Sequence, residues 1–268
     1  MCNFNDKLLK IMNMKTTKRF LGLLIILTLI LNVSCNFAQD KNNNIEINEF
    51  IFKKDTAIAN VDENGEQMGI LDTCHGYIDL SLLMFKSNDK IDENKLNQFV
   101  TSNLKELNGV EFSDFNGLKS YLKDYVPINE EDYKISINLN NDKVISLTMY
   151  SRRLGCGGNI VSMISTYLNY DILNNKEIEL KDILLSNELK NVENKCKQIL
   201  IKDFNKSDLD SYDYRLSDIF YITNDNIVFY YPTYTIGCGA EGPFEVPIPF
   251  SDISSSLTET FKKMIDIK

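Results

Sequence analysis

Residues 133–152 read YKISINLNNDKVISLTMYSR and set the fold class. Tyr133–Leu139 and Val144–Arg152 each alternate apolar and polar side chains, which is the pattern of a strand with one buried face. Between them, Asn140-Asn141-Asp142 provides residues that favour a tight turn. The stretch therefore predicts an antiparallel β-hairpin.

Toward the C-terminus the sequence predicts a long helix among further strands. In Ser186–Phe204 the apolar residues recur at helical spacing. Prolines restrict Phe244–Pro249 to the edge of a sheet. The elements expected after the first hairpin are strand Ile160–Asp171, short strand Glu177–Leu180, helix Ser186–Phe204, a hairpin of Ile219–Thr223 and Ile227–Tyr231, strand Phe244–Pro249, and a last helix capped by Ser251 or Asp252 that ends near Met264.

The N-terminal half predicts strands followed by two helices. The expected elements are short strands at Ile45–Phe52 and Thr56–Val61, a turn at Glu63–Glu66, strands at Gln67–Leu71 and Tyr77–Phe85, and helices at Asp92–Leu107 and Ser113–Tyr125. Hairpins and grouped helices, in place of alternating strands and helices, indicate the α+β class with a mainly antiparallel sheet and packed helices. We place the internal boundary near Val126–Asp132, which gives sections 51–127 and 128–268.

The first 35 residues have the order of a removable export signal. Lys15, Lys18 and Arg19 precede the apolar run Phe20–Leu31, and small or polar residues follow. The run is too short to span a bilayer, which needs about 20 helical residues. Residues 1–34 are therefore interpreted as a signal peptide.

The end of this segment resembles the lipobox of bacterial lipoproteins. Val33-Ser34-Cys35 has the expected small residues before a cysteine, although Asn32 stands where leucine is usual. Lipidation of Cys35 is the favoured prediction, and plain cleavage near Ala38-Gln39 is the alternative. The polar residues 35–50 then form a tether between membrane and domain.

The exported chain is strongly acidic. Loss of residues 1–34 removes five of the 29 basic side chains and one of the 38 acidic ones, which leaves a net charge of −13. Binding to nucleic acid depends on Lys and Arg, so nucleic acid is excluded as a partner. A cationic partner suits this charge.

The cysteine and histidine pattern argues against common catalytic and metal sites. The chain has one histidine, His75, beside Cys74. Adjacent residues seldom form a catalytic dyad, and a single histidine leaves a zinc site without a second imidazole ligand. Acidic pairs such as Asp208 and Asp210 are expected by chance in so acidic a chain. We therefore expect no metal or cofactor.

The second half resembles an exported family of domains of unknown function. This family occurs at the C-terminus of the lysozyme-sensing anti-sigma factor RsiV and in the non-catalytic part of PdaC-type deacetylases. The residues that carry the resemblance are Val144–Leu147, Gly157-Gly158, Tyr167–Asp171, Glu179–Leu184, Phe220–Asp225, Ile227–Tyr231, Tyr234–Gly237, Ala240–Phe244 and Ile248–Ser251. The resemblance implies an RsiV C-terminal-like fold for residues 128–268.

Two loops of this family pattern contain departures. The glycine pair is followed by Asn159 where the family often has Ala-His, and each loop has acquired a cysteine, Cys156 or Cys238. Each of these cysteines stands between two glycines, and an oxidising envelope permits a Cys156–Cys238 disulfide. Two free thiols are the alternative. Cys196 lies on the apolar side of its helix and is expected to be buried.

A ligand face is predicted where these loops meet. Its candidate residues are Asn159, Tyr234, Glu241 and Phe244, because loops with rigid aromatic rings are common binding devices. Burial of the aromatic residues in the core is the equally weighted alternative.

The sequence favours a lipoprotein of the cell envelope, periplasmic or surface-exposed, with a non-catalytic binding domain. The expected partner is a lysozyme-like cationic protein or peptidoglycan, and the lipid anchor contacts the membrane. An envelope hydrolase or deacetylase is the alternative function, and it would need a nucleophile, metal or acid pair. A purely structural envelope protein is the third possibility.

Overall fold

The computed structural model describes residues 45–59, 73–87, 93–104, 112–127, 129–155 and 160–266. All described residues belong to one compact unit. The predicted signal peptide, Cys35 and most of the tether lie outside the described residues. No described helix is both long and apolar enough to cross a membrane.

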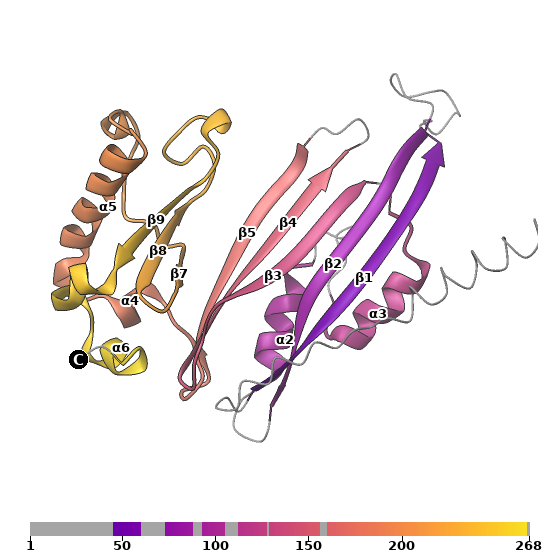
Figure 1. The fold of residues 1–268 in the computed structure, drawn as a ribbon, viewed down its shortest axis with the longest axis horizontal. Helices are drawn as coiled ribbons and strands as arrows, with labels where there is room; N and C mark the ends of the chain where they lie inside the picture. Colours follow the sequence, from indigo (N-terminus) through magenta and orange to yellow (C-terminus); the bar gives the residue numbers. More distant parts are fainter. Residues whose placement is uncertain are drawn as a thin grey trace, which may run out of the picture. The chain divides into compact units, whose positions relative to one another are not determined.

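Six of the described strands form one sheet in chain order (Figure 1). They are β1 (Ile45–Ala59), β2 (Thr73–Ser87), β3 (Glu130–Asn140), β4 (Val144–Leu154), β5 (Ile160–Asp171) and β6 (Lys176–Glu177). The predicted hairpin is confirmed as β3 and β4, with a β-bulge between Ile137 and Leu139. β2 and β3 run parallel, and the other neighbouring strands described in this sheet are antiparallel.

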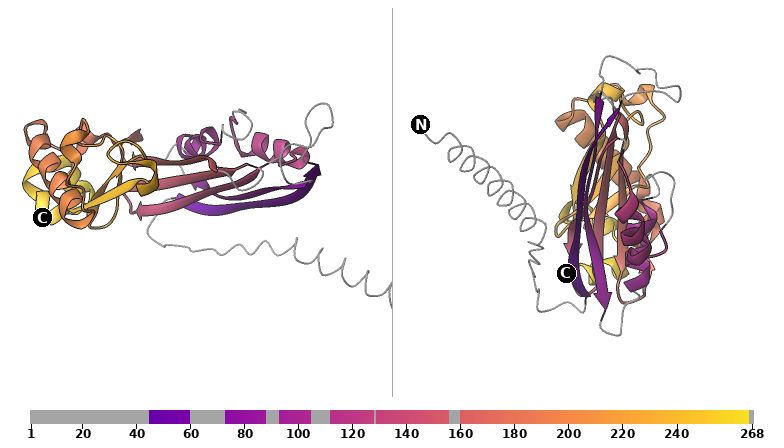
Figure 2. Two further views of the ribbon diagram at one scale, coloured as in Figure 1. Left: turned by 90° about the horizontal axis from the view of Figure 1, so that it is seen from above. Right: turned by 90° about the vertical axis from the view of Figure 1, so that its right-hand side faces the viewer.

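Two helices cover one face of this sheet (Figure 2). They are α2 (Glu93–Ser102) and α3 (Phe115–Asp124), and both lie in the connection between the parallel strands. Asn97 fixes α2 to β2, because its side-chain amide donates to the Phe85 carbonyl and accepts from the Phe85 N–H, at 2.8 and 2.9 Å. The first core lies between this face and the helices and includes Leu80, Leu96 and Leu118, all fully buried.

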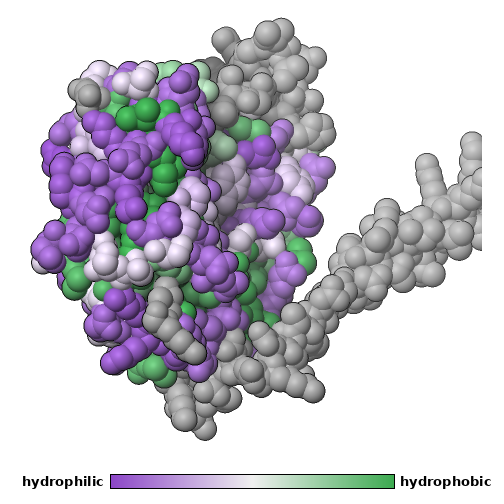
Figure 3. Space-filling model, turned by 60° about the vertical axis from the view of Figure 1, so that its left-hand side comes forward, coloured by the Kyte–Doolittle hydropathy of each residue, from purple (hydrophilic) through white to green (hydrophobic). Residues whose placement is uncertain are grey.

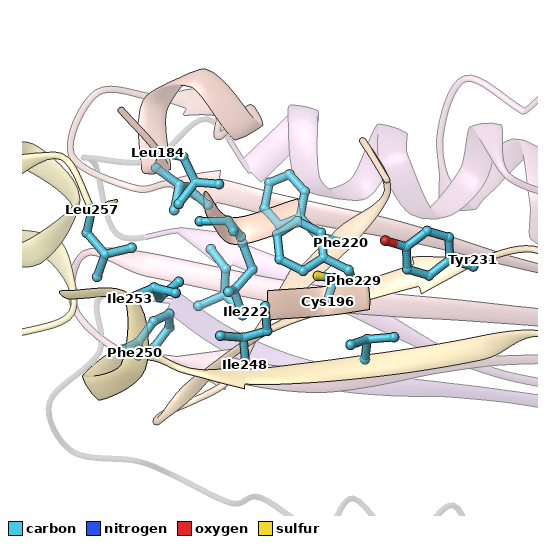
Figure 4. Packing of buried hydrophobic residues seen from close by; sticks show 14 of the residues in the cluster. Leu184, Cys196, Phe220, Ile222, Phe229, Tyr231, Ile248, Phe250, Ile253 and Leu257 are labelled. Atoms are coloured by element: carbon cyan, nitrogen blue, oxygen red, sulfur yellow. The ribbon is translucent and has the colours of Figure 1, made fainter. Parts of the chain in front are cut away.

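The second core is built on a three-stranded antiparallel sheet among the remaining described residues. Its strands are β7 (Phe220–Ile222), β8 (Asn226–Tyr231) and β9 (Phe244–Pro249), and its helices are α4 (Leu180–Ile183), α5 (Leu189–Asp203) and α6 (Glu259–Met264). Apolar side chains from these elements meet in one cluster (Figure 4). The prediction that Cys196 is buried is confirmed.

Buried hydrogen bonds join the two sheets. The Asn169 side-chain amide donates to the Phe220 carbonyl at 2.9 Å, and the Ser146 hydroxyl donates to Asn169 Oδ1 at 2.7 Å. The Ile222 N–H in turn donates to Ser146 Oγ at 3.1 Å. Strands β4 and β5 therefore hold β7 through polar side chains as well as apolar contacts.

The predicted α+β class with a mainly antiparallel sheet is confirmed. Two strands predicted within residues 45–61 are one strand, β1, in the structure. The predicted strand Glu177–Leu180 is wrong beyond Glu177, because a capping box at Glu179 begins α4. The predicted last helix is also divided, since a 3₁₀ segment at Phe250–Ser256 precedes α6 and Thr258 caps α6.

The sheet continues across the boundary that the sequence suggested at residue 128. Tyr77 pairs with Glu130 in the parallel register, and its N–H donates to the Asn129 carbonyl at 2.8 Å. Pro127 lies against Gly76, where a Cβ atom would come within 1.8 Å of the Pro127 carbonyl oxygen. The first core draws residues from both sides of this position.

Candidate functional site: a groove along the open edge of β5

An open groove of about 620 Å³ runs beside β5. It takes residues from four separated parts of the chain. The lining comprises Phe99 and Asn103, Ser165–Tyr167 and Asn169 of β5, Glu177–Lys181, and Asp218–Phe220. No single stretch of sequence could have indicated this site, because its walls are brought together only by the pairing of strands.

The edge of β5 forms the floor of the groove. β6 pairs only with Tyr170 and Asp171, and the last bond of this ladder is from the Ile178 N–H to the Asn169 carbonyl, at 2.7 Å. Glu179 then begins α4, and the chain leaves the edge. On the edge of β5 that faces away from β4, no strand in the described parts of the chain pairs with the residues that precede Asn169.

The two walls come from opposite faces of the six-stranded sheet. Leu168 and Tyr170 point into the first core, on the side of α2, which contributes Phe99 to the groove. Asn169 points to the opposite face, where it binds Phe220, and this side contributes Asp218–Phe220. A chain lying along β5 would therefore place alternate side chains against the two walls.

The charge of the groove is negative. Glu177, Glu179 and Asp218 supply carboxylates to the described lining, whereas Lys181 is the single cation in it. Lys181 Nζ lies 2.5 Å from Glu179 and offsets the charge of that carboxylate. Burial raises the pKa of Glu177, and the nearby Glu179 charge adds to this effect. A cationic group in the groove would relieve this repulsion.

Stacked tyrosines adjoin the groove through Tyr167, which belongs to its lining. The rings of Tyr167 and Tyr221 stack at 5.3 Å, and Tyr230 lies 5.0 Å from Tyr167. Burial, with a smaller contribution from the Glu245 carboxylate, raises the pKa of Tyr167 far above its ordinary value. Tyr167 therefore stays neutral at physiological pH, and its half-buried ring lines the groove that also holds the carboxylates.

The residues predicted to bind a ligand occupy different environments. Asn159 and Cys156 lie outside the described residues. Tyr234 is 77% exposed and has a φ of 71°, whereas Phe244 is buried in the second core. Ligand binding by these residues and the Cys156–Cys238 disulfide stay predictions; Cys238 itself is exposed and carries a free thiol in the structure.

Glu241 holds its own loop in place. Its carboxylate accepts from the Cys238 N–H at 2.7 Å and from Lys206 Nζ at 3.1 Å. Lys206 is buried between this carboxylate, Asp208 and the Phe244 ring. Burial lowers the pKa of Lys206, but the two carboxylates outweigh burial and the net pKa is raised.

A second hollow of about 600 Å³ lies on the helix-free face of the six-stranded sheet. Its central carboxylates, Asp79 and Asp132, are direct neighbours across the parallel strands. Lys53 lies 2.5 Å from Asp79, and Arg152 pairs with Asp132, so each carboxylate has its own cation. No group of three or more potential metal-ligating side chains occurs among the described residues. The groove beside β5 therefore remains the better candidate site.

The chain resembles a family and a fold that are already known. The family model described as a protein of unknown function (DUF3298) matches residues 171–251. This segment is a DUF3298 family domain. It contributes Glu177–Lys181 and Asp218–Phe220 to the groove, whereas Phe99, Asn103 and most of β5 lie before the DUF3298 match.

Two crystal structures of DUF3298 proteins have a similar fold. One is a DUF3298 member from Bacteroides fragilis, with a TM-score of 0.63, 17% identity, and coverage of 88% of this chain and 99% of the other. The second is a DUF3298 protein from Pseudomonas aeruginosa, with a TM-score of 0.57, 15% identity, and coverage of 82% and 97%. At these identities the likeness shows the fold alone. No curated protein matches the chain.

Proposed function

We propose that this protein is a non-catalytic binding module of the cell envelope whose partner is a cationic protein held at the groove beside β5. The observation that carries the proposal is the groove lining, in which three carboxylates and one lysine accompany the half-buried rings of Phe99 and Tyr167. Charge complementarity of this kind directs association and selects partners.

Two features of the chain agree with this function. The exported part has a net charge of −13 by sequence, and the molecular surface seen in Figure 3 is mainly hydrophilic, with small hydrophobic areas between polar residues. A lysozyme-like protein is the favoured partner, through the sequence resemblance to the RsiV C-terminal domain. Lipidation at Cys35 would tether the module to the membrane outside the cytoplasm.

Binding of purified lysozyme to the full chain in detergent tests the proposal. The groove variant combines Glu177→Gln, Glu179→Gln and Asp218→Asn. The control combines Asp142→Asn, Asp252→Asn and Glu259→Gln, which removes the same charge at exposed positions outside the groove lining. We expect the groove variant to lose at least tenfold in affinity at about 0.1 M salt, with the control within about threefold of wild type.

Equal losses in the two variants would show that only net charge matters and would contradict a groove site. Absence of lysozyme binding by the wild-type chain would remove the favoured partner. Turnover of muropeptides, measured by release of acetate or of cleavage products, would replace the binding module with the alternative hydrolase or deacetylase function.

A further inference from the structure

We propose that the groove takes its partner as an extended segment that pairs with the open edge of β5, antiparallel to it, in the place that a longer β6 would occupy. This inference rests on the proposed function and adds the form in which the partner is recognised. Strand addition at a sheet edge provides affinity through backbone hydrogen bonds and selectivity through side chains that alternate between pockets.

The backbone of β5 offers groups for this pairing. The Asn169 carbonyl already accepts from β6. Because successive residues of a strand point their backbone groups to opposite sides, Tyr167 and Ser165 present N–H and C=O to the same edge. Both residues line the groove. Leu168 and Thr166 point their backbone groups toward β4, with which β5 is paired along its length.

The part of this edge that lines the groove lacks the features that normally prevent strand pairing. Natural edge strands carry charges, prolines or bulges, or are very short. The part of β5 from Met163 to Leu168 reads MISTYL and contains neither a charge nor a proline. By contrast, β1 carries Glu46, Glu49, Lys53, Lys54 and Asp55, β9 contains Pro247 and Pro249, and β7 has three residues. The unprotected edge is the one that faces the groove.

The walls of the groove specify the segment. A strand in line with β6 would run next to Glu177 and Glu179, and its alternate side chains would face Phe99 on one wall or Asp218 and Ile219 on the other. Ile219 is 39% exposed and offers an apolar contact. We therefore assign the occupant as an extended peptide of a cationic protein in which Lys or Arg alternates with apolar residues.

A synthetic acetylated and amidated hexapeptide of alternating Lys and Val is the probe, titrated against the full chain in detergent. Two further peptides carry N-methyl groups, one on every Lys amide and the other on every Val amide. Only one alternate set of amides can face β5, so we expect one methylated peptide to lose at least tenfold in affinity while the other stays within about threefold.

The matched change in the protein is Ser165→Pro, which removes an N–H on the open edge and leaves the bonds between β5 and β4 in place. Ser165→Ala is its control, because it keeps the N–H. We expect a tenfold weaker peptide affinity for the proline variant only, with both variants giving the wild-type circular dichroism spectrum.

Strand addition would be refuted if the two methylated peptides lost affinity equally. It would also be refuted if the parent peptide bound with a Kd above 1 mM, which corresponds to a binding free energy of ~4 kcal/mol. The proposed function has its own outcome, because it depends on the difference in lysozyme binding between the groove variant and its charge-matched control. Lysozyme binding that depends on the groove carboxylates, together with a peptide insensitive to methylation, would retain the function and reject this mode of recognition.

Discussion

Replacement of Gly76 by alanine should destabilise the protein strongly, because the chain after α3 lies directly on this glycine. A Cβ atom at Gly76 would be 1.8 Å from the Pro127 carbonyl oxygen, where 3.0 Å is the practical minimum. The segment must move by more than 1 Å. This movement would break the hydrogen bonds from Thr56 Oγ1 to the Pro127 carbonyl, at 3.0 Å, and from the Tyr77 N–H to the Asn129 carbonyl, at 2.8 Å.

The expected cost follows from these contacts. Each hydrogen bond contributes about 1 kcal/mol, and overpacking of this kind costs about 1–3 kcal/mol. The free energy of unfolding should therefore fall by about 3–5 kcal/mol, measured by urea unfolding of the full chain followed by circular dichroism. This would be a large part of the ~5–15 kcal/mol typical of a domain.

Gly117→Ala is the matched control. Gly117 lies in α3, and a Cβ atom there meets only Asp114 Oδ1, at 3.6 Å. Because alanine favours a helix over glycine, this change should raise the free energy of unfolding by about 0.5 kcal/mol. A loss below about 1 kcal/mol in Gly76→Ala would refute the close packing of the segment and with it the parallel pairing of β2 and β3.

Two further predictions concern buried titratable groups. Burial raises the pKa of Glu131, although Tyr125 Oη donates to it at 2.7 Å and Arg153 lies 3.6 Å away. The free energy of unfolding should therefore fall as the pH rises from ~4.3, the ordinary pKa of Glu in the unfolded chain, through the raised pKa of the folded protein. Glu131→Gln should flatten this slope in urea unfolding between pH 4.5 and 8, and an unchanged slope would contradict the assignment. Burial raises the pKa of Cys196 to about 12, so at pH 8 iodoacetamide should leave this thiol unmodified until urea is added. Exposed Cys238 should react at once, or after reduction if it is in a disulfide, and mapping of labelled peptides checks both results.

Local patterns predicted the elements whose burial alternates along the chain. Every second side chain enters the first core at Tyr133 and Ile135 of β3 and at Ile145, Leu147 and Met149 of β4, so the hairpin was visible in YKISINL and VISLTMYSR. The polar run Lys53-Lys54-Asp55 instead suggested a break in β1. The strand continues there because Lys53 pairs with Asp79 on β2 and Lys54 donates to the Tyr125 carbonyl.

Long-range contacts account for what the sequence did not predict. The parallel pairing of β2 with β3 joins residues separated by two helices, and no local pattern encodes it. Glu241 was a candidate ligand residue, but in the structure it accepts a hydrogen bond from Lys206, which is 35 positions away in the sequence. The groove combines Phe99 with Asp218 and could be recognised only after the sheets were assembled.

The hydrogen-bonded joint between the sheets determines how the groove meets a partner. Two apolar surfaces can slide past one another at little cost. A shift of β7 by one residue, however, would break the hydrogen bonds that Ser146 and Asn169 make with the β7 backbone, at about 1–3 kcal/mol for each buried polar group left without a partner. Phe220, a wall of the groove, is therefore held at a fixed spacing from the β5 edge. A partner meets a slot whose width is already set, so little of its binding free energy is consumed in shaping the receptor.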